Sequence, residues 1–197
     1  NLDLVKKYFK VTDNPEEADV ALVFIENPRA TIGYDKADVE KGGNGYIPIS
    51  LQYSDYTATT ARATSIAGGD PMEDFTNRSY KGKSTKTANH TDAKLVTETK
   101  AKMKGKPVIV SVNTGNPLVF SEIEKAASAL LVNFNVQDQA IFDLLAGKAE
   151  PTGLLPMQMP ANMVTVEKQF EDVPLDMDPH VDAAGHAYNF GFGLNWD

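Results

Sequence analysis

The sequence predicts an α/β fold, a three-layer α/β/α sandwich in which helices cover both faces of a mostly parallel sheet. Three short apolar runs have the character of buried strands, and amphipathic stretches with helical spacing separate them. The chain has 197 residues, 42% of them hydrophobic, which is enough for one domain with its own core. No internal repeat is present, and we expect residues 1–197 to form a single domain.

The predicted strands are residues 20–25, 108–112 and 129–132. The first, VALVFI, lies between Asp19 and Glu26, and the second begins directly after Pro107. Each run is apolar throughout rather than alternating, which is typical of strands that are buried on both faces of a sheet. Strands joined through helices run parallel, so these three are expected to form a parallel sheet.

Four stretches carry apolar side chains at the spacing of an amphipathic helix. They cover residues 2–9, 92–103, 119–127 and 136–146. In the first, Leu2, Val5 and Phe9 share one face. Asp92 is expected to cap the second helix by accepting hydrogen bonds from free N–H groups of its first turn. The residues expected to face inward from the second helix are Leu95, Val96, Thr99 and Met103.

The fourth predicted helix ends in the segment LAGKAEPTGLLPMQMP, residues 145–160. Gly147 can leave the helix at a positive φ, and Pro151 cannot continue it. The residues expected on the buried side of this helix are Val136, Ala140, Ile141, Leu144 and Leu145.

The sheet has an unusual beginning, because a sheet of this kind commonly opens with a strand and this sequence opens with a helical stretch. We expect a first strand just upstream of Asn1, or a sequence that starts within its domain. Residues 31–86 hold no strong helix, and an unstructured loop of that length is rare unless it is functional. Within it, residues 47–63 are expected to hold a short strand and helix, and residues 70–86 an exposed excursion.

Composition excludes several classes of function. The net charge of −8 repels phosphate backbones, so we expect no nucleic-acid partner. The absence of cysteine excludes disulfides, thiolate catalysis and cysteine-type zinc sites. No apolar run approaches the ~20 residues of a membrane span.

Four motifs with known chemistry are incomplete or absent in this sequence. The run from Gly82 to Thr85 resembles the end of a P-loop, but Asn77 stands where that motif needs a glycine. The glycines around Asn44 lack the spacing of a dinucleotide fingerprint and indicate a loop whose backbone can approach a ligand. No G-x-S-x-G nucleophile elbow occurs. His180 and His186 fit no standard metal spacing, so we expect neither a metal nor a cofactor.

Polar side chains gather where the predicted strands end, which is where an open α/β sheet binds ligands. Glu26, Asn27 and Arg29 follow the first strand, and asparagines follow the other two. These groups are the donors and acceptors that a sugar needs, although each asparagine also suits a turn. Beyond the first strand, Glu40 lies just before the glycine cluster and Asn44 lies within it.

Five segments occur in an informative order. Residues 18–23 read ADVALV, residues 107–118 read PVIVSVNTGNPL, and residues 129–140 read ALLVNFNVQDQA. The segment 145–160 follows, and residues 188–196 close the chain with YNFGFGLNW. Together they resemble, in order, the motifs of the C-terminal α/β sandwich domain of glycoside hydrolase family 3, the β-glucosidase family.

The sequence departs from that family's pattern in three places. Leu154 stands where the family usually has arginine in P-S-G-R-L-P, and Phe134 and Val136 replace parts of an aromatic-Pro-Gly turn. Residues 53–88 are longer than the corresponding region of the simplest members, and we expect them to be an insertion within the domain.

The resemblance implies a retaining β-glycosidase, in which two carboxyl groups flank the scissile bond. The family's nucleophilic aspartate lies on a preceding (β/α)₈ barrel domain, so it lies outside this chain. The α/β domain often supplies the acid/base glutamate. By position Glu40 is the first candidate and Glu26 the second, with Asn27, Arg29 and Asn44 as candidate substrate-binding residues. The implied partners are a β-linked glucoside or related oligosaccharide and the barrel domain.

Two other interpretations stay open. The domain can be a scaffold or sugar-contact unit without a catalytic group, or a free-standing flavodoxin-like module for a small ligand. Family members are commonly exported, which implies a periplasmic or secreted location.

Overall fold

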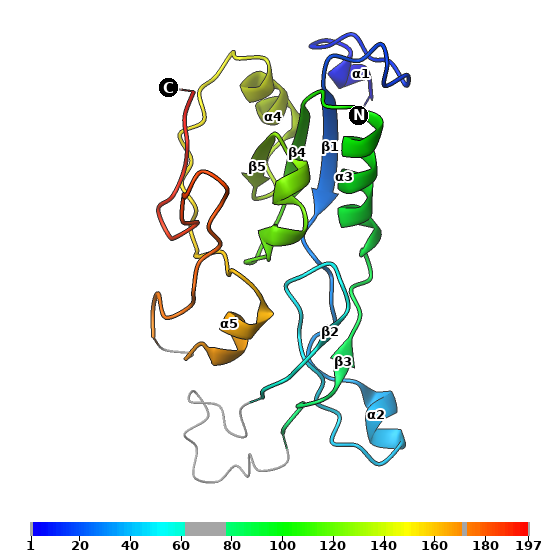
Figure 1. Ribbon diagram of the computed structural model, residues 1–197, viewed down its shortest axis with the longest axis vertical. Helices are drawn as coiled ribbons and strands as arrows, with labels where there is room; N and C mark the ends of the chain where they lie inside the picture. The colour runs from blue at the N-terminus through cyan, green and yellow to red at the C-terminus, as the bar shows by residue number, and fades with distance from the viewer. Residues whose placement is uncertain (1, 62–77, 171–172, 197) are drawn as a thin grey trace.

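The computed structural model of the chain describes residues 2–61, 78–170 and 173–196. At its centre lies a parallel sheet of β1 (Ala21–Glu26), β4 (Val108–Asn113) and β5 (Ala129–Asn133), in the order β1-β4-β5 (Figure 1). Ala21 pairs with Val108 in the first ladder, and Ile109 with Ala129 in the second. The three predicted strands and their parallel arrangement are therefore confirmed.

Helices lie on both faces of this sheet. α3 (Thr91–Lys102) packs against β1 and β4 on one face, where Val96 is fully buried. α4 (Asp138–Leu145) lies on the other, where the ring of Phe142 contacts the ring of Phe24 at a centroid distance of 5.9 Å. The three-layer α/β/α sandwich is thus confirmed.

The core is concentrated on the α3 face of the sheet. Side chains alternate along each strand, so Val23 and Ile25 are buried on that face while Phe24 points to the other. Phe120 and Tyr53, both fully buried, fill the space between the sheet and the loops below it. Leu22 and Phe24 on the opposite face are only partly covered.

The segment 145–160 joins the core through the C-terminal chain. Gly147 follows α4 with φ +67°, and its N–H donates to the Leu144 carbonyl at 2.9 Å, as the sequence predicts. Met159 is fully buried, and its N–H donates to the carbonyl of Tyr188 at 2.9 Å. The turn therefore carries an extended segment into the core, where residues near the C-terminus hold it.

Two predicted helices are wrong in extent or type. Residues 2–9 form only the four-residue α1 (Leu2–Val5), followed by hydrogen-bonded turns to Phe9. Residues 119–127 form two 3₁₀ turns, Phe120–Glu122 and Glu124–Ala126, in place of an α-helix. Phe120 and Ile123 are fully buried, and the Ile123 N–H donates to the Phe120 carbonyl at 3.0 Å, which is the three-residue hydrogen bond of a 3₁₀ turn.

The other two helices start differently from the prediction. α3 begins after His90, and Asp92 accepts from the Glu26 N–H and from Asn89 Nδ2 instead of capping the helix. Leu95 is also 48% exposed rather than inward-facing. α4 begins two residues late, so Val136 lies outside the helix and is exposed, and Ala140 is exposed within it. Asn135 with φ +56° turns the chain just before it.

Between β1 and α3, the described residues 27–61 and 78–90 form an excursion away from the sheet. It contains α2 (Lys36–Glu40) and an antiparallel ribbon of β2 (Tyr56–Thr57) and β3 (Ser84–Thr85). β2 confirms the strand predicted within residues 47–63, whereas the helix predicted there does not occur in the described part, 47–61. Residues 70–77 of the predicted exposed excursion lie outside the described residues, and Thr85 at its far end is buried.

α5 (Met163–Lys168) completes the secondary structure of the described chain. None of the helices in residues 2–61, 78–170 and 173–196 has the length and apolar character that crossing a membrane requires.

Candidate functional site

The carboxyl ends of the three strands bring Glu26 together with two asparagines. Asn113 Nδ2 donates to both carboxylate oxygens of Glu26, at 3.2 and 3.4 Å. The same amide donates to Asn135 Oδ1 at 2.9 Å, and the Asn135 N–H donates back to Asn113 Oδ1 at 2.9 Å. Parallel strands end at one edge of a sheet, so residues far apart in sequence form one polar row here.

The backbone of Glu26 is held on the side away from β4. Its N–H donates to Asp92 Oδ2 at 3.2 Å, and its carbonyl accepts from the Tyr53 hydroxyl at 2.6 Å. Burial raises the pKa of the Tyr53 hydroxyl far above its ordinary value, so Tyr53 remains a donor at any physiological pH. Glu26 thus presents an exposed carboxylate on a fixed backbone.

Asn27 and Arg29 follow Glu26 and differ in what they offer a ligand. Asn27 Nδ2 donates to Asn116 Oδ1 at 2.9 Å and to the Pro28 carbonyl at 3.2 Å, so this amide organises the turn. Arg29 is fixed through its backbone, whose N–H donates to Asn89 Oδ1 at 2.7 Å. Its exposed side chain lines the same groove as Glu26.

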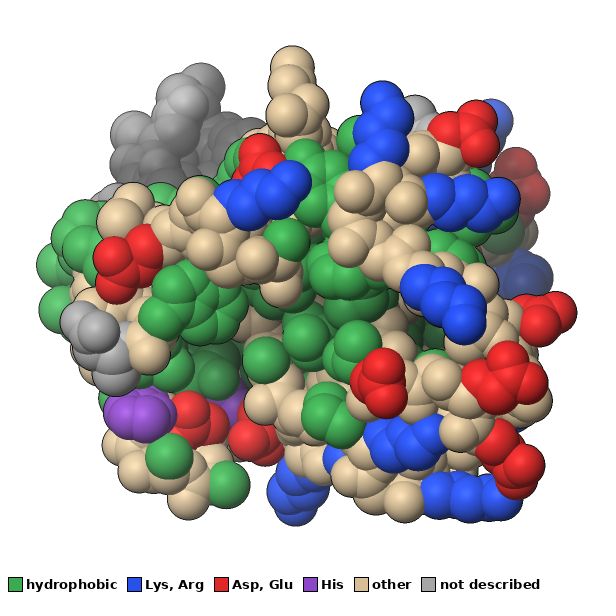
Figure 2. Space-filling model, turned by 90° about the horizontal axis from the view of Figure 1, so that it is seen from above, with side chains coloured by type: hydrophobic (Ala, Val, Ile, Leu, Met, Phe, Trp, Pro, Cys, Tyr) green, Lys and Arg blue, Asp and Glu red, His purple; other side chains and the backbone are tan. Residues whose placement is uncertain are grey.

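This polar row forms one end of a groove of about 1290 Å³. Glu26, Arg29 and Asn113 line the groove at the sheet's carboxyl edge, and Phe9 and Phe142 line its apolar part. We call it the β1 groove, because most residues of β1 line it. Figure 2, which looks onto the end of the molecule where α1 lies, shows hydrophobic side chains gathered in a hollow that charged side chains border. A polar end beside an apolar wall is the arrangement that small-ligand sites commonly use.

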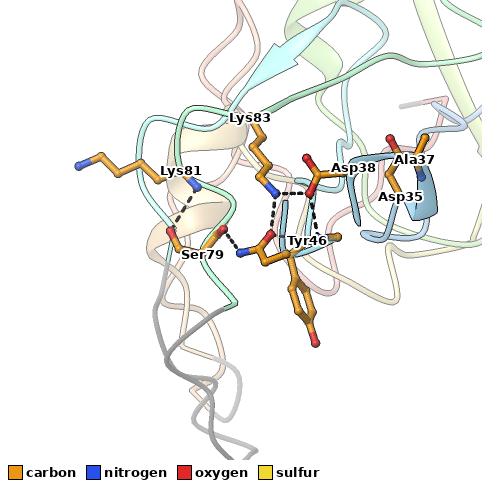
Figure 3. A network of polar contacts seen from close by, with 9 residues as sticks. Asp35, Ala37, Asp38, Tyr46, Ser79, Lys81 and Lys83 are labelled. Carbon is orange, nitrogen blue, oxygen red and sulfur yellow. Dashed lines mark hydrogen bonds and ion pairs between the residues drawn. The ribbon is translucent and has the colours of Figure 1, made fainter. Parts of the chain in front are cut away.

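A second polar cluster joins α2, which ends at Glu40, to the loop that contains Asn44 (Figure 3). Lys83 Nζ lies 2.7 Å from Asp38 Oδ2 and 2.5 Å from Asn44 Oδ1. Asn44 Nδ2 donates to the Ser79 carbonyl at 2.8 Å, and the Gly45 N–H donates to Asp38 Oδ2 at 2.8 Å. The hydrogen bond from Lys83 lowers the pKa of the Asp38 carboxyl below its ordinary value, and that from Gly45 acts in the same direction.

Close packing in this cluster explains why glycine occupies the positions beside Asn44. A Cβ on Gly43 would lie 2.1 Å from Asp38 Oδ2, and one on Gly45 would lie 2.5 Å from the Tyr34 ring. Gly45 also has φ +81°, which L side chains rarely adopt. The backbone does approach other groups closely here, as expected, but those groups belong to the protein itself.

The sequence-predicted site residues therefore fall into two groups. Glu26, Asn27 and Arg29 share the edge of the sheet. Glu40 is exposed at the end of α2, and Asn44 is bound within the cluster of Lys83. Figure 1 places α2 beyond the β2–β3 ribbon, away from the strand ends.

Sequence reasoning missed the residues that hold both groups in place. The sequence marks Lys83 only as part of a P-loop-like run, and no local pattern marks Asp38 or Tyr53. Gly43 and Gly45 were a usable signal, because closely spaced glycines mark places where something approaches the backbone. The partners of Lys83 lie 39 and 45 residues away, so no local pattern identifies them.

The histidines near the C-terminus serve packing and local turns. His180 is buried, in ring contact with Phe120 and Tyr188, and burial lowers its pKa below the ordinary value. His186 Nδ1 lies 3.0 Å from Asp182 Oδ2. Within the described ranges, no group of three or more acidic or histidine side chains is placed to hold a metal ion.

Comparison with known proteins gives a family match over almost the whole chain. The profile described as Glycosyl hydrolase family 3 C-terminal domain matches residues 6–196. Beta-glucosidase C of Emericella nidulans is 33% identical over 84 residues, which are 43% of this chain and 14% of that protein. Probable beta-glucosidase C of Aspergillus oryzae is 34% identical over 90 residues, 46% of this chain and 13% of that protein.

A bacterial protein shows a longer but weaker similarity. The Periplasmic beta-glucosidase/beta-xylosidase of Dickeya chrysanthemi is 27% identical over 120 residues, 61% of this chain. The matched part of the chain spans 17% of that protein's length. The curated relatives are thus several times longer than the part that this chain matches.

Proposed function

Because the chain belongs to the family of glycosyl hydrolase family 3 C-terminal domains, we propose that it works as the α/β domain of a retaining β-glycosidase. Its substrate is a β-linked glucoside or a related oligosaccharide, and a (β/α)₈ barrel domain of the same protein supplies the nucleophilic aspartate. The family match over residues 6–196 carries this proposal. The names of the fungal and bacterial relatives support the hydrolase class.

Glu40 is the proposed acid/base residue. It ends α2, whose Asp38 is held by Lys83 and Gly45, so the helix is a fixed support for an exposed carboxyl group. A general acid must keep its proton near neutral pH, which requires a site shielded from water. The barrel domain provides that shielding when it covers α2.

Glu26 is the second candidate for the acid/base and otherwise a sugar-contact residue. Its carboxylate already accepts hydrogen bonds from Asn113, and an ionised oxygen held in this way is suited to accept a sugar hydroxyl. Arg29 offers guanidinium donors in the same groove, where its side chain is exposed. Asn27 and Asn44 act as positioning residues, because their amides are engaged within the protein.

Glu40→Gln in the full-length enzyme tests the assignment. A lost general acid should lower kcat/KM for substrates with poor leaving groups by about 10²- to 10⁴-fold, while activated aryl glucosides lose less. Azide should restore turnover by attacking the glycosyl-enzyme intermediate. The matched control is Glu98→Gln, which alters an exposed glutamate on α3 and should leave both substrates unaffected.

The scaffold interpretation predicts a different result from the same variants. Unchanged activity in Glu40→Gln, with a loss and azide rescue in Glu26→Gln, would transfer the role to Glu26. Unchanged activity in both would leave the domain without a catalytic group. For location, we propose the periplasm or the cell exterior, in keeping with the name of the bacterial relative.

A further inference from the structure

The sequence contains one Asn-Gly pair, Asn44-Gly45, and this pair lies inside the cluster of Lys83. Asparagine before glycine is chemically labile, because glycine has no side chain to hinder attack of its backbone nitrogen on the amide carbon of the preceding residue. The attack also needs freedom of movement, since the nitrogen and the carbon must first come together in a reactive geometry. The contacts that hold this pair therefore control how fast it reacts.

The fold favours both residues at these positions. Asn44 Nδ2 donates to the Ser79 carbonyl at 2.8 Å, and Oδ1 accepts from Lys83 Nζ at 2.5 Å. At position 45 a Cβ would lie 2.5 Å from the Tyr34 ring, and φ is +81°. A residue other than glycine is strained there. The labile pair is thus built into the packing of this loop.

Each group that the reaction uses is already hydrogen-bonded (Figure 3). The nucleophile, the Gly45 nitrogen, donates its hydrogen to Asp38 Oδ2 at 2.8 Å. The leaving group, Asn44 Nδ2, is the donor to residue 79 described above. The carbonyl oxygen of the same amide accepts from the Tyr46 N–H at 3.1 Å as well as from Lys83. Ring closure has to turn the amide toward Gly45, which breaks the contacts at both of its ends.

We propose that Asn44 is a deamidation site that the cluster of Lys83 keeps closed, so that it reacts only when the loop opens. In that reaction the Gly45 nitrogen bonds to Asn44 Cγ and loses its proton to water. The Cγ–Nδ2 bond breaks, and Nδ2 leaves as ammonia with a proton returned by water. A water molecule then adds to the cyclic imide and opens it, giving aspartate or isoaspartate at position 44. This inference goes beyond the proposed function and does not depend on it.

Opening of this cluster is a local event. Lys83 and Asp38, each with 25% of its side chain exposed, join the excursion to α2 and lie outside the hydrophobic core around the sheet. Such contacts open at a lower cost in free energy than the core does. Opening also frees the Gly45 N–H from Asp38. Hydrogen exchange of that amide and deamidation of Asn44 should therefore report the same event.

Deamidation would remove part of the support of the cluster. A carboxylate at position 44 has no N–H to donate to the Ser79 carbonyl, and it would share Lys83 with the carboxylate of Asp38. Isoaspartate in addition lengthens the backbone next to Gly45, whose carbonyl accepts from the Asp35 N–H at 2.8 Å. The modification therefore makes a reversible opening permanent and loosens the start of α2.

Peptide mapping by mass spectrometry tests this in the full-length protein during storage at neutral pH, because it separates Asn44 from its aspartate and isoaspartate products. In the folded protein Asn44 should deamidate about 10-fold more slowly, or slower still, than in the same protein unfolded in urea. Equal rates in the folded and the unfolded protein would overturn the proposal.

Two variants test whether the cluster is the restraint. In the folded protein Lys83→Met and Asp38→Asn should each raise the rate at Asn44 about 10-fold, with faster exchange of the Gly45 amide. In urea both variants should react at the rate of the natural protein. Unchanged rates in the two folded variants would overturn the proposal. A slower reaction in Asp38→Asn would also overturn it, because Asp38 would then promote the attack by accepting the Gly45 proton.

A matched control separates this restraint from a general loss of stability. Lys94→Met breaks the exposed pair with Glu98 on α3 and should leave the rate at Asn44 unchanged. The amide of Val110, which is fully buried in β4, should stay protected in every variant, which shows that the sheet remains folded. Faster deamidation in Lys94→Met, equal to that in Lys83→Met, would contradict the assignment to the cluster.

Discussion

Lys83, which directly precedes β3, binds Asp38 of α2 through an Nζ–Oδ2 contact of 2.7 Å, and the same Nζ binds Asn44. Two segments that are 45 residues apart in the chain are joined here. The side chains of Lys83 and Asp38 are each 25% exposed, so the pair is partly shielded from water. The position of the proposed acid/base residue Glu40 depends on this contact, because both acidic residues belong to one short helix.

Lys83→Met should loosen α2 while leaving the sheet intact. The Gly45 amide, which donates to Asp38, should then exchange faster with solvent, and the denaturation midpoint should fall. The pKa of Asp38 is lowered in the folded protein, so this contribution to stability is present above the ordinary pKa of about 3.9 and is lost as the pH falls through the lower folded value. Lys94→Met, which breaks the exposed pair with Glu98, is the control and should change neither quantity.

His180 should make the stability of the domain sensitive to mild acid. Its imidazole is buried against Phe120 and Tyr188, and Nε2 has no hydrogen-bond partner in the described structure. Burial lowers the pKa, whereas Glu124 and Asp182 oppose the shift, and the net pKa lies below the ordinary value. The unfolded chain therefore binds the proton first, and stability falls as the pH drops from about 6.5 through the folded pKa.

Urea denaturation midpoints between pH 7.5 and pH 5 measure this effect. His180→Phe keeps an aromatic ring and removes the titration, so its midpoint should change less with pH. His90→Phe alters an exposed histidine and should retain the slope of the natural protein. Equal slopes for all three proteins would contradict the assignment.

Tyr53→Phe should destabilise the domain by about 1 kcal/mol, because the hydroxyl donates to the Glu26 carbonyl from a fully buried position. The Asn89 amide lies 3.4 Å from the same carbonyl and compensates only in part. Thermal or urea unfolding measures the loss. Tyr34→Phe, at a half-exposed tyrosine, serves as the control. Equal stability of the two variants would show that the Tyr53 hydrogen bond contributes nothing.

The 197-residue chain alone should not hydrolyse an aryl β-glucoside, because the proposed nucleophile lies on another domain and Glu40 is open to water. Release of the aryl group, followed by absorbance, measures this directly. Turnover that persists in both Glu40→Gln and Glu26→Gln, and that copurifies with the chain, would refute the shared-site mechanism.

Local pattern was sufficient for the elements that are apolar along their whole length. The strands at residues 21–26, 108–113 and 129–133 were predicted from their continuous apolar runs, and the stop at Gly147 from the freedom of glycine at positive φ. Burial on both faces was predicted too strongly, because β1 and β5 are only partly covered. The ordered motifs from residue 18 to residue 196 were enough to identify the family, since motif order survives without knowledge of contacts.

Contacts between residues far apart in the sequence decided the hydrogen-bond partners, the caps and the helix types. The Glu26 carboxylate accepts a hydrogen bond from Asn113, which is 87 residues away in the sequence. Asp92, predicted to cap its own helix, instead accepts from the N–H of Glu26, which is 66 residues away. Residues 120–126 form 3₁₀ turns beside the buried Phe120 and Ile123, although periodicity also allows an α-helix there. Periodicity records which face of a segment is apolar. Hydrogen-bond partners and caps depend on what the fold brings against that segment.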